Sequence, residues 1–263
     1  MDIAAQKLLA IVVIWLIGLV AGLWPVLIGA RTPHDRFFSL GNALAGGVFL
    51  GAGLIHLLPD AIDSYRAVLG PDLDYPLASL VCAAGFLLVL LIEKVLLRGD
   101  EPQLAEAASD SDSGSAFTPY VLALVLSVHS VIAGVALGAE SSVATTIALF
   151  IAIVAHKGVA AFALGVNLHR AHVARGRSIS IVALFAAMTP LGVAVGASLG
   201  AALSNESAQW FEGTFDALAA GTFLYIAVVD LVEDEFSKPQ DVALKFAMVL
   251  LGIAIMALVA LWT

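Results

Sequence analysis

The amino-acid sequence predicts an all-α polytopic membrane protein with eight transmembrane helices. Of its 263 residues, 61% are hydrophobic and only 13% are charged, whereas about a quarter of the residues in a soluble domain are charged. The mean hydropathy of +1.01 points the same way. The chain also contains eight apolar stretches close to the roughly 20 residues that a helix needs to cross a bilayer.

These stretches account for nearly all of the sequence, so we expect a single transmembrane domain over residues 1–263. The expected spans are Leu8–Ala30, Ser39–Asp60, Leu77–Leu97, Pro119–Gly138, Ala144–Asn167, Ile179–Leu203, Phe215–Val232 and Val242–Trp262. The connection 98–117 is rich in Ala, Ser, Asp and Glu. Such a segment buries too little apolar surface to order itself, and we expect a flexible cytoplasmic loop there.

The distribution of Lys and Arg predicts the orientation of the chain in the membrane. Nine of these residues lie in the odd-numbered connections and two in the even-numbered connections and the termini, while Lys157 lies in mid-span. Both termini should therefore be extracytoplasmic, in a plasma or inner membrane. The net charge of −9 predicts no nucleic-acid partner but suits an attraction for cations. Assembly as a homodimer is left open.

We expect the first span to be a helix that packs against its neighbours and carries no functional residues. The second carries Gly47 and Gly51 four residues apart, a spacing that favours close helix contact. His56 follows about one turn before Pro59, and the third span ends at Glu93, beside a lysine in an ordinary interfacial ion pair.

The fourth and fifth spans hold a duplicated motif. His129 begins His-Ser-Val-Ile-Ala-Gly-Val-Ala-Leu-Gly, and in the next span His156 begins His-Lys-Gly-Val-Ala-Ala-Phe-Ala-Leu-Gly. If the two helices are adjacent and antiparallel, the imidazoles meet at a similar depth. Imidazole is a good ligand for zinc, iron, copper and nickel, although a buried histidine can also be a hydrogen-bonded structural residue.

A second internal repeat relates the second span to the seventh, in a register that places His56 opposite Asp230. By the charge count, both repeated pairs of spans run in opposite directions through the membrane. Inverted repeats of this kind are typical of secondary transporters, so the sequence favours transport over enzymatic activity. A membrane-embedded hydrolase finds little support, because neither motif histidine has a carboxylate close to it in sequence.

The two histidine motifs resemble those of the ZIP (Zrt/Irt-like) family of divalent metal transporters, in the subgroup with His-Ser and His-Lys motifs. The resemblance extends to His56-Leu-Leu-Pro59, to Met188-Thr-Pro-Leu-Gly192 and to Gly221-Thr-Phe-Leu-Tyr225. It implies a 3+2+3 inverted-repeat arrangement, movement of metal into the cytoplasm, and a metal site between the fourth and fifth helices. His129 and His156 fall on its liganding positions.

The sequence departs from this family where acidic ligands are usual. The glutamates expected in the fourth and fifth helices are Ala133 and Ala160 here. Asp230 corresponds to an acidic position of the seventh helix and could replace them, or it could be an ordinary interfacial charge. By the same resemblance, Lys157 and Thr189 replace ligands of a second metal, which implies a mainly single-metal site.

We therefore expect import of a divalent transition metal, zinc before iron, manganese or cadmium, with no cofactor and no enzymatic chemistry. His129 and His156 would bind the metal. The transport pathway would include Ser130, Lys157, Thr189, Asp230 and His56. Ser130 can equally serve helix packing, and His56 can equally bond the backbone opened by Pro59. The alternative is a ZIP-like metal sensor or interaction protein that does not transport, as the missing glutamates suggest.

Overall fold

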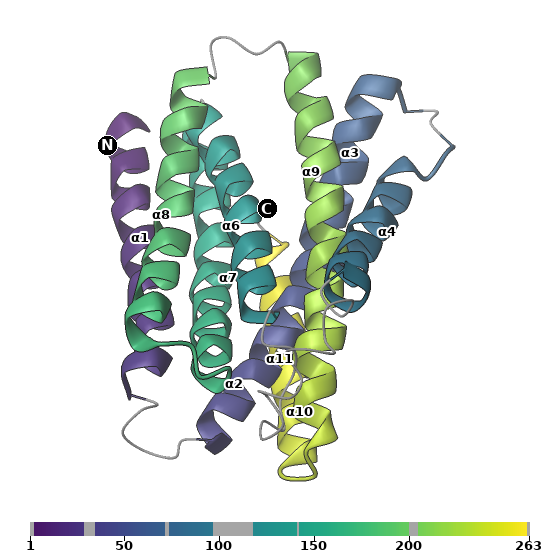
Figure 1. Ribbon diagram of the computed structural model, residues 1–263. Helices are drawn as coiled ribbons and strands as arrows, with labels where there is room; N and C mark the ends of the chain where they lie inside the picture. The colour runs from purple at the N-terminus through teal and green to yellow at the C-terminus, as the bar shows by residue number, and fades with distance from the viewer. Residues whose placement is uncertain are drawn as a thin grey trace.

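The computed structural model describes residues 3–28, 35–71, 74–96, 118–140, 142–199 and 205–261, and across these ranges the protein is helical without strands (Figure 1). The elements are α1 Ile3–Ile28, α2 Asp35–Gly51, η1 Ala52–Leu57, α3 Leu58–Leu69, α4 Leu77–Leu90, η2 Leu91–Leu96, α6 Thr118–Ala139, α7 Val143–Arg170, α8 Arg175–Leu199, α9 Asn205–Tyr225, η4 Ile226–Val232, α10 Glu233–Ser237 and α11 Val242–Val259. Within these ranges, eight helical stretches are long and apolar enough to cross a membrane. The prediction of eight spans is thereby confirmed. The loop expected at 98–117 lies outside the described residues.

The helices pack as two groups of four spans (Figure 1). We call α1, α6, α7 and α8 the first bundle. The second bundle comprises α2 with η1 and α3, α4 with η2, α9 with η4 and α10, and α11. The bundles meet chiefly where α2 faces α7 and α6 faces α9, so a site between them draws on both groups. The 3+2+3 arrangement of the repeats stays a prediction.

Glycines set the close helix contacts inside each bundle. In the first bundle, a Cβ on Gly134 of α6 would overlap the carbonyl oxygen of Thr189 in α8, and a Cβ on Gly192 would overlap the carbonyl oxygen of Val131. In the second bundle, Gly47 of α2 lies in the same way against the backbone of Val249 in α11. Backbones approach this closely only where the side chains are small, as expected for Gly47.

Three π-helical segments interrupt the second bundle, and two of them coincide with the internal repeat. These two are η1 at Ala52–Leu57 and η4 at Ile226–Val232. The register that places His56 opposite Asp230 also carries the first residue of η1 onto the first residue of η4. The third segment, η2 at Leu91–Leu96, holds Glu93. Because π-turns are rare and are found frequently at functional sites, their recurrence at matched positions supports the repeat.

The second span is longer than the sequence predicted, since its helix continues beyond Asp60 to Leu69. Pro59 does not end it: Leu57 and Leu58 keep helical dihedral angles, and the proline follows immediately after the π-turn, in a helix that runs on without a break. The extension packs on α9. Tyr65 contacts the ring of Trp210 at 5.4 Å between centroids and shares a 2.9 Å hydrogen bond with Thr214.

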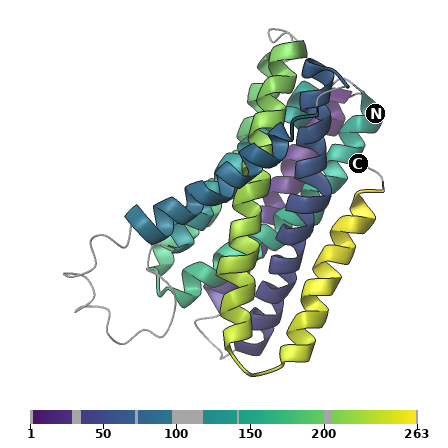
Figure 2. The same ribbon diagram turned by 90° about the vertical axis from the view of Figure 1, so that its right-hand side faces the viewer.

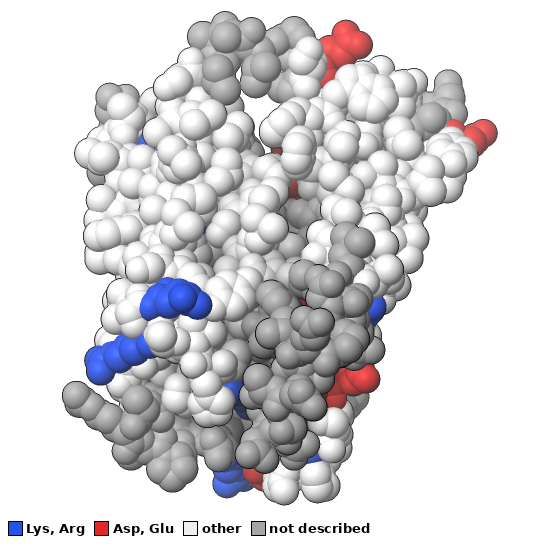
Figure 3. Space-filling view, viewed as in Figure 1, with Lys and Arg blue, Asp and Glu red and all other residues white. Residues whose placement is uncertain are grey.

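The two termini lie at the same end of the molecule (Figures 1 and 2). The start of α2, the end of α7, the start of α8 and the turn between α10 and α11 lie at the opposite end. This end carries most of the described Lys and Arg side chains, which appear in blue on the lower half of Figure 3. We call it the basic end. Its charge agrees with the count made from the sequence.

Candidate metal centre

The fold brings the two motif histidines together. His129 lies on α6 and His156 on the neighbouring α7, with their ring centroids 5.6 Å apart. Only 6% of His129 and 5% of His156 is exposed. The ring of Phe223, on α9 of the second bundle, contacts His129 at 4.6 Å between centroids. The histidine pair therefore lies in the seam between the two bundles.

Both imidazole nitrogens of His129 are buried and have no hydrogen-bond partner in the described structure. His156 interacts with the backbone of Ala152, one turn earlier on α7. Buried polar atoms are almost always paired, so each exception calls for an explanation such as an ion. A neutral imidazole with a free nitrogen is a metal ligand. The chemistry of the pair therefore fits a transition metal passing through as substrate.

Carboxylates do not join the histidines. Ala160 is buried and packs in the main apolar core, while Ala133 packs against the apolar core of the first bundle. Within the described ranges, no group of three or more His, Cys, Asp or Glu is arranged to hold a metal ion. Among the described residues, the two imidazoles thus adjoin without a carboxylate.

Lys157 is turned into the first bundle. Its Nζ donates hydrogen bonds to Oγ of Ser130 at 2.8 Å and to the carbonyl oxygen of Phe185 at 3.2 Å. The same Nζ lies 3.6 Å from the centroid of the Phe185 ring, which provides a cation–π contact. Ser130 is therefore a partner of this lysine, and the buried ammonium has three stabilising contacts without a carboxylate.

Thr189 lies on α8, one turn beyond Phe185, and is 1% exposed. Its Oγ1 has no hydrogen-bond partner in the described structure. Its backbone lies against Gly134 of α6, one turn beyond the first motif residues. The structure thus gathers Ser130, Lys157 and Thr189 in the core of the first bundle, beside the histidine pair.

Asp230 lies away from the histidine pair. It belongs to η4, seven residues beyond Phe223, which corresponds to about 10 Å along a helix axis. Its charged neighbours are Glu93, Lys94 and Glu233. Whether Asp230 serves as a later station on the pathway or as an interfacial charge stays open.

Glu93 has a more buried position than the sequence indicated. Its side chain is 2% exposed, Oε1 pairs with Lys94 at 2.6 Å, and the carboxylate also interacts with the side chain of Asp230. The ion pair with Lys94 is thus present as expected, but the carboxylate is buried beside Asp230. The sequence signal for this buried carboxylate was a glutamate in the last turn of an apolar span.

At the other end of the seam, His56 lies close enough to both imidazoles to interact with them electrostatically. Its Nδ1 is 2.9 Å from Oδ2 of Asp60. Asp60 in turn acts on Asp216 and Glu212, one helical turn apart on α9. These two carboxylates were not singled out from the sequence, although their spacing of four residues puts them on one helix face.

The molecule is hollowed on the side of the termini. Figure 3 shows an opening between the two bundles, with red carboxylate atoms in its depth. Such a lining attracts cations and raises their local concentration. The molecule thus offers an acidic approach on the side of the termini and a histidine pair farther along the same seam.

Comparison with known proteins agrees with this picture. A family model described as ZIP zinc transporter matches residues 4–99 and 97–260. Zinc transporter ZIP2 of Mus musculus is 30% identical over an alignment that covers 91% of this chain and 90% of that protein. Zinc transporter ZIP1 of Homo sapiens is 30% identical, with 95% and 89% covered. Zinc transporter 3 of Arabidopsis thaliana is 28% identical, with 97% and 84% covered.

These relatives bear the names of transporters rather than enzymes, and their alignments cover 91% and 95% of this chain. The family model likewise matches almost every described residue. On these grounds, the chain belongs to the ZIP zinc transporter family.

Proposed function

We propose that this protein imports divalent transition-metal ions, zinc first among them, across a plasma or inner membrane. The metal would bind His129 and His156 in the seam between the bundles. The observation that carries the proposal is a pair of buried imidazole rings 5.6 Å apart, in which both nitrogens of His129 have no partner among the described residues. The metal is the transported substrate, so no resident cofactor is required.

A single metal is favoured over a pair. Lys157 fills the core beside the histidines with a cation that already has its own hydroxyl, carbonyl and aromatic partners. A second divalent ion at this place would meet an ammonium instead of an anionic ligand, and the two like charges would repel each other. Thr189 offers only a hydroxyl on the same side.

The absence of carboxylates at Ala133 and Ala160 suggests a weakly held ion. A divalent cation is costly to place in an apolar seam without anionic ligands. Water would complete the shell of four ligands that zinc prefers. Loose binding is compatible with transport, because an ion that enters a site must also leave it.

The placement of charge supports inward movement. With the basic end in the cytoplasm, the cluster of Asp60, Glu212 and Asp216 beside His56 would face outward and attract cations. Asp230 and Glu93 then lie beyond the histidine pair, toward the basic end. A rocking movement of one bundle against the other would open the seam to each side in turn.

Ala133 and Ala160 also favour a second candidate function. A ZIP-like protein that has lost its anionic ligands could bind metal as a sensor or as an interaction partner without moving it. In that case the histidine pair would bind metal in detergent, and no metal would cross the membrane.

Uptake into proteoliposomes separates these functions. The protein is reconstituted around a zinc-sensitive dye and compared with His129→Ala and His156→Ala. His172→Asn is the matched control, because this histidine, outside the seam, has a φ of 52°, which asparagine tolerates. We expect flux in the wild type and the control and loss of flux in both site variants.

Two other outcomes would point to a different site or a different function. Full flux in both site variants would place the transport site elsewhere. If the wild type binds zinc in detergent but gives no flux with any metal or at any pH, the sensor function is supported instead.

A further inference from the structure

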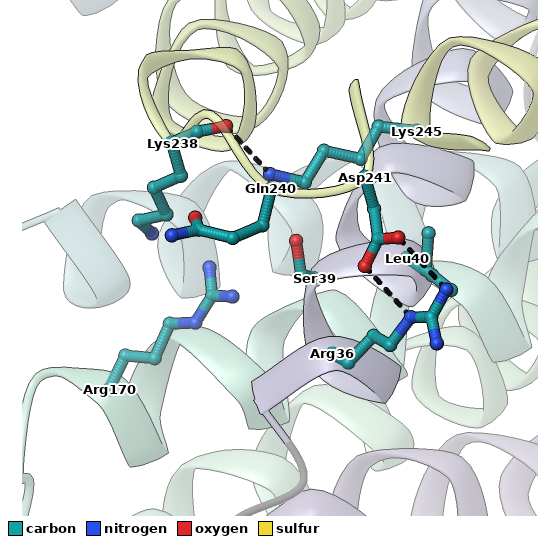
Figure 4. Close-up of a pocket in the computed structure, with 8 residues that line it drawn as sticks. All are labelled: Arg36, Ser39, Leu40, Arg170, Lys238, Gln240, Asp241 and Lys245. Atoms are coloured by element: carbon teal, nitrogen blue, oxygen red, sulfur yellow. Dashed lines mark hydrogen bonds and ion pairs between the residues drawn. The ribbon is translucent and has the colours of Figure 1, made fainter. Parts of the chain in front are cut away.

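A cavity of about 490 Å³ opens at the basic end of the molecule, away from the histidine pair (Figure 4). It lies between the start of α2, the end of α7 and the turn that joins α10 to α11. Four basic side chains line it together with two neutral polar ones, namely Arg36, Arg170, Lys238 and Lys245 with Ser39 and Gln240. A cavity of this size can hold a phosphate group with its substituent.

Basic side chains outnumber carboxylates around the cavity. Asp241 is the carboxylate among the lining residues, and Arg36 holds it by two contacts of 2.8 Å, from Nε and from Nη2. Asp234 and Glu235 both form ion pairs with Nη1 of Arg170. Together with Asp241, these two carboxylates leave the four cations with a net charge of +1. Lys245 also donates to the backbone oxygens of Glu235 and Lys238, so Arg36, Arg170 and Lys238 are the cations with donors to spare.

Hydrogen-bond donors remain for a ligand. Arg36 engages Asp241 through two of its nitrogens, which leaves Nη1, and Arg170 uses only Nη1 toward the described residues. Lys238 makes one 3.0 Å contact with Asp234, although an ammonium has three protons. In Figure 4 the guanidinium of Arg170 and the amide of Gln240 point into the cavity. Guanidinium groups suit phosphate because two parallel N–H groups match two of its oxygens.

We propose that this cavity binds a phosphate-bearing anion. Basic pockets between membrane helices on the cytoplasmic side are suited to anionic lipid headgroups, and the apolar side chains next to the lining in sequence agree with lipid contact. Phe37, beside Arg36, is 48% exposed, and Phe246, beside Lys245, is 55% exposed. A soluble phosphate compound would use the same donors.

The cavity also bridges the two bundles. Arg170 belongs to α7 of the first bundle, and the other lining residues belong to the second. An anion bound to Arg170 and to Arg36 or Lys238 at once would tie the bundles together at the basic end. Bound phosphate would then favour the arrangement seen here over one in which the bundles have separated at this end.

The test uses the full-length protein in detergent. Native mass spectrometry measures its binding of phosphatidic acid, phosphatidylglycerol and phosphatidylcholine, and calorimetry measures binding of inorganic phosphate and inositol hexakisphosphate. The pocket variant is Arg36→Gln/Lys238→Gln, at side chains that are 70% and 41% exposed. The matched control is Arg175→Gln/Arg177→Gln, which removes the same charge from exposed positions at the start of α8.

We expect the pocket variant to bind the anion about 25-fold more weakly, because each basic side chain near an anionic group contributes about fivefold. The control should stay within about twofold of the wild type. Asp241→Asn should strengthen binding about fivefold, since it removes the opposing carboxylate, and asparagine accepts the φ of 54° at this position. This variant keeps the proposal testable if the double variant folds poorly.

The lipid measurements and the soluble-anion measurements together identify the source of the phosphate group. Binding of anionic lipid alone indicates a headgroup site, and binding of the soluble anions alone indicates a soluble ligand. The proposal is overturned if anionic lipid binds no better than phosphatidylcholine and neither soluble anion binds. It is also overturned if the pocket and control variants weaken binding equally, because the effect would then come from general surface charge.

Discussion

The buried carboxylate of Glu235 allows a sharp prediction about stability. Glu235 is fully buried on α10 and accepts hydrogen bonds from Ser39 of α2 and from Arg170 of α7, the latter at 2.5 Å. The ammonium of Lys245 is 4.0 Å away. Arg170→Gln removes the guanidinium that bonds Oε1. Leaving a buried charge without its partner costs about 3–5 kcal/mol, so we expect a loss of unfolding free energy of that size.

The matched comparison is Lys238→Gln, because Lys238 pairs with the neighbouring Asp234 but the two side chains are 41% and 38% exposed. An exposed pair is worth about 0–1 kcal/mol. Both variants are unfolded by titration with SDS in mixed micelles. The double variant Glu235→Gln/Arg170→Gln should lose less unfolding free energy than the two single variants added together, since the two residues contact each other. Equal losses for Arg170→Gln and Lys238→Gln would refute this reasoning.

Three further changes test the site and the packing. Ala133→Glu should raise zinc affinity in calorimetry, because it adds an anionic ligand one turn from His129; unchanged affinity would mean that other groups complete the shell. Lys157→Met should raise zinc affinity roughly tenfold by removing a nearby positive charge, and a fall would show that the ammonium organises the site. Gly221→Ala should lower the free energy of unfolding by about 1–3 kcal/mol, because its Cβ would overlap the Cys82 carbonyl oxygen. Gly176→Ala is the control: it has open space around it and should change the SDS unfolding little.

Much of the fold could be predicted because apolar length and periodicity report directly on membrane helices. The internal repeat was also visible in the sequence, and its matched π-turns support it. The π-turns themselves were not predictable, since an added residue in a helical turn leaves no distinct pattern of residue types. The second span continues from its π-turn to Leu69, past Asp60, where the sequence predicted its end.

The grouping of spans into two bundles depends on contacts between residues far apart in the chain. Gly134 against Thr189 and Gly47 against Val249 are such contacts. The sequence shows that small residues are present, but it does not show which helix each one meets. The 3+2+3 description orders the repeats along the chain, whereas the contacts group four spans with four.

The candidate site was predictable to the extent that local motifs define it. The sequence predicted that His129 and His156 could adjoin, and the structure places their rings together. The partners of Lys157 were less accessible, because the Phe185 carbonyl that it bonds lies on another helix. The basic cavity was missed for the same reason. Its cations come from three segments far apart in the chain, and each segment reads alone as an ordinary interfacial charge.

The central claim is that zinc binds between His129 and His156. X-ray absorption at the zinc edge tests it most directly, on protein loaded with one equivalent of zinc. We expect two imidazole nitrogens at about 2.0–2.1 Å, the remaining ligands being oxygen, and a single imidazole in either His129→Ala or His156→Ala. An imidazole count that stays the same in both variants, or a carboxylate-only shell in the wild type, would contradict the account.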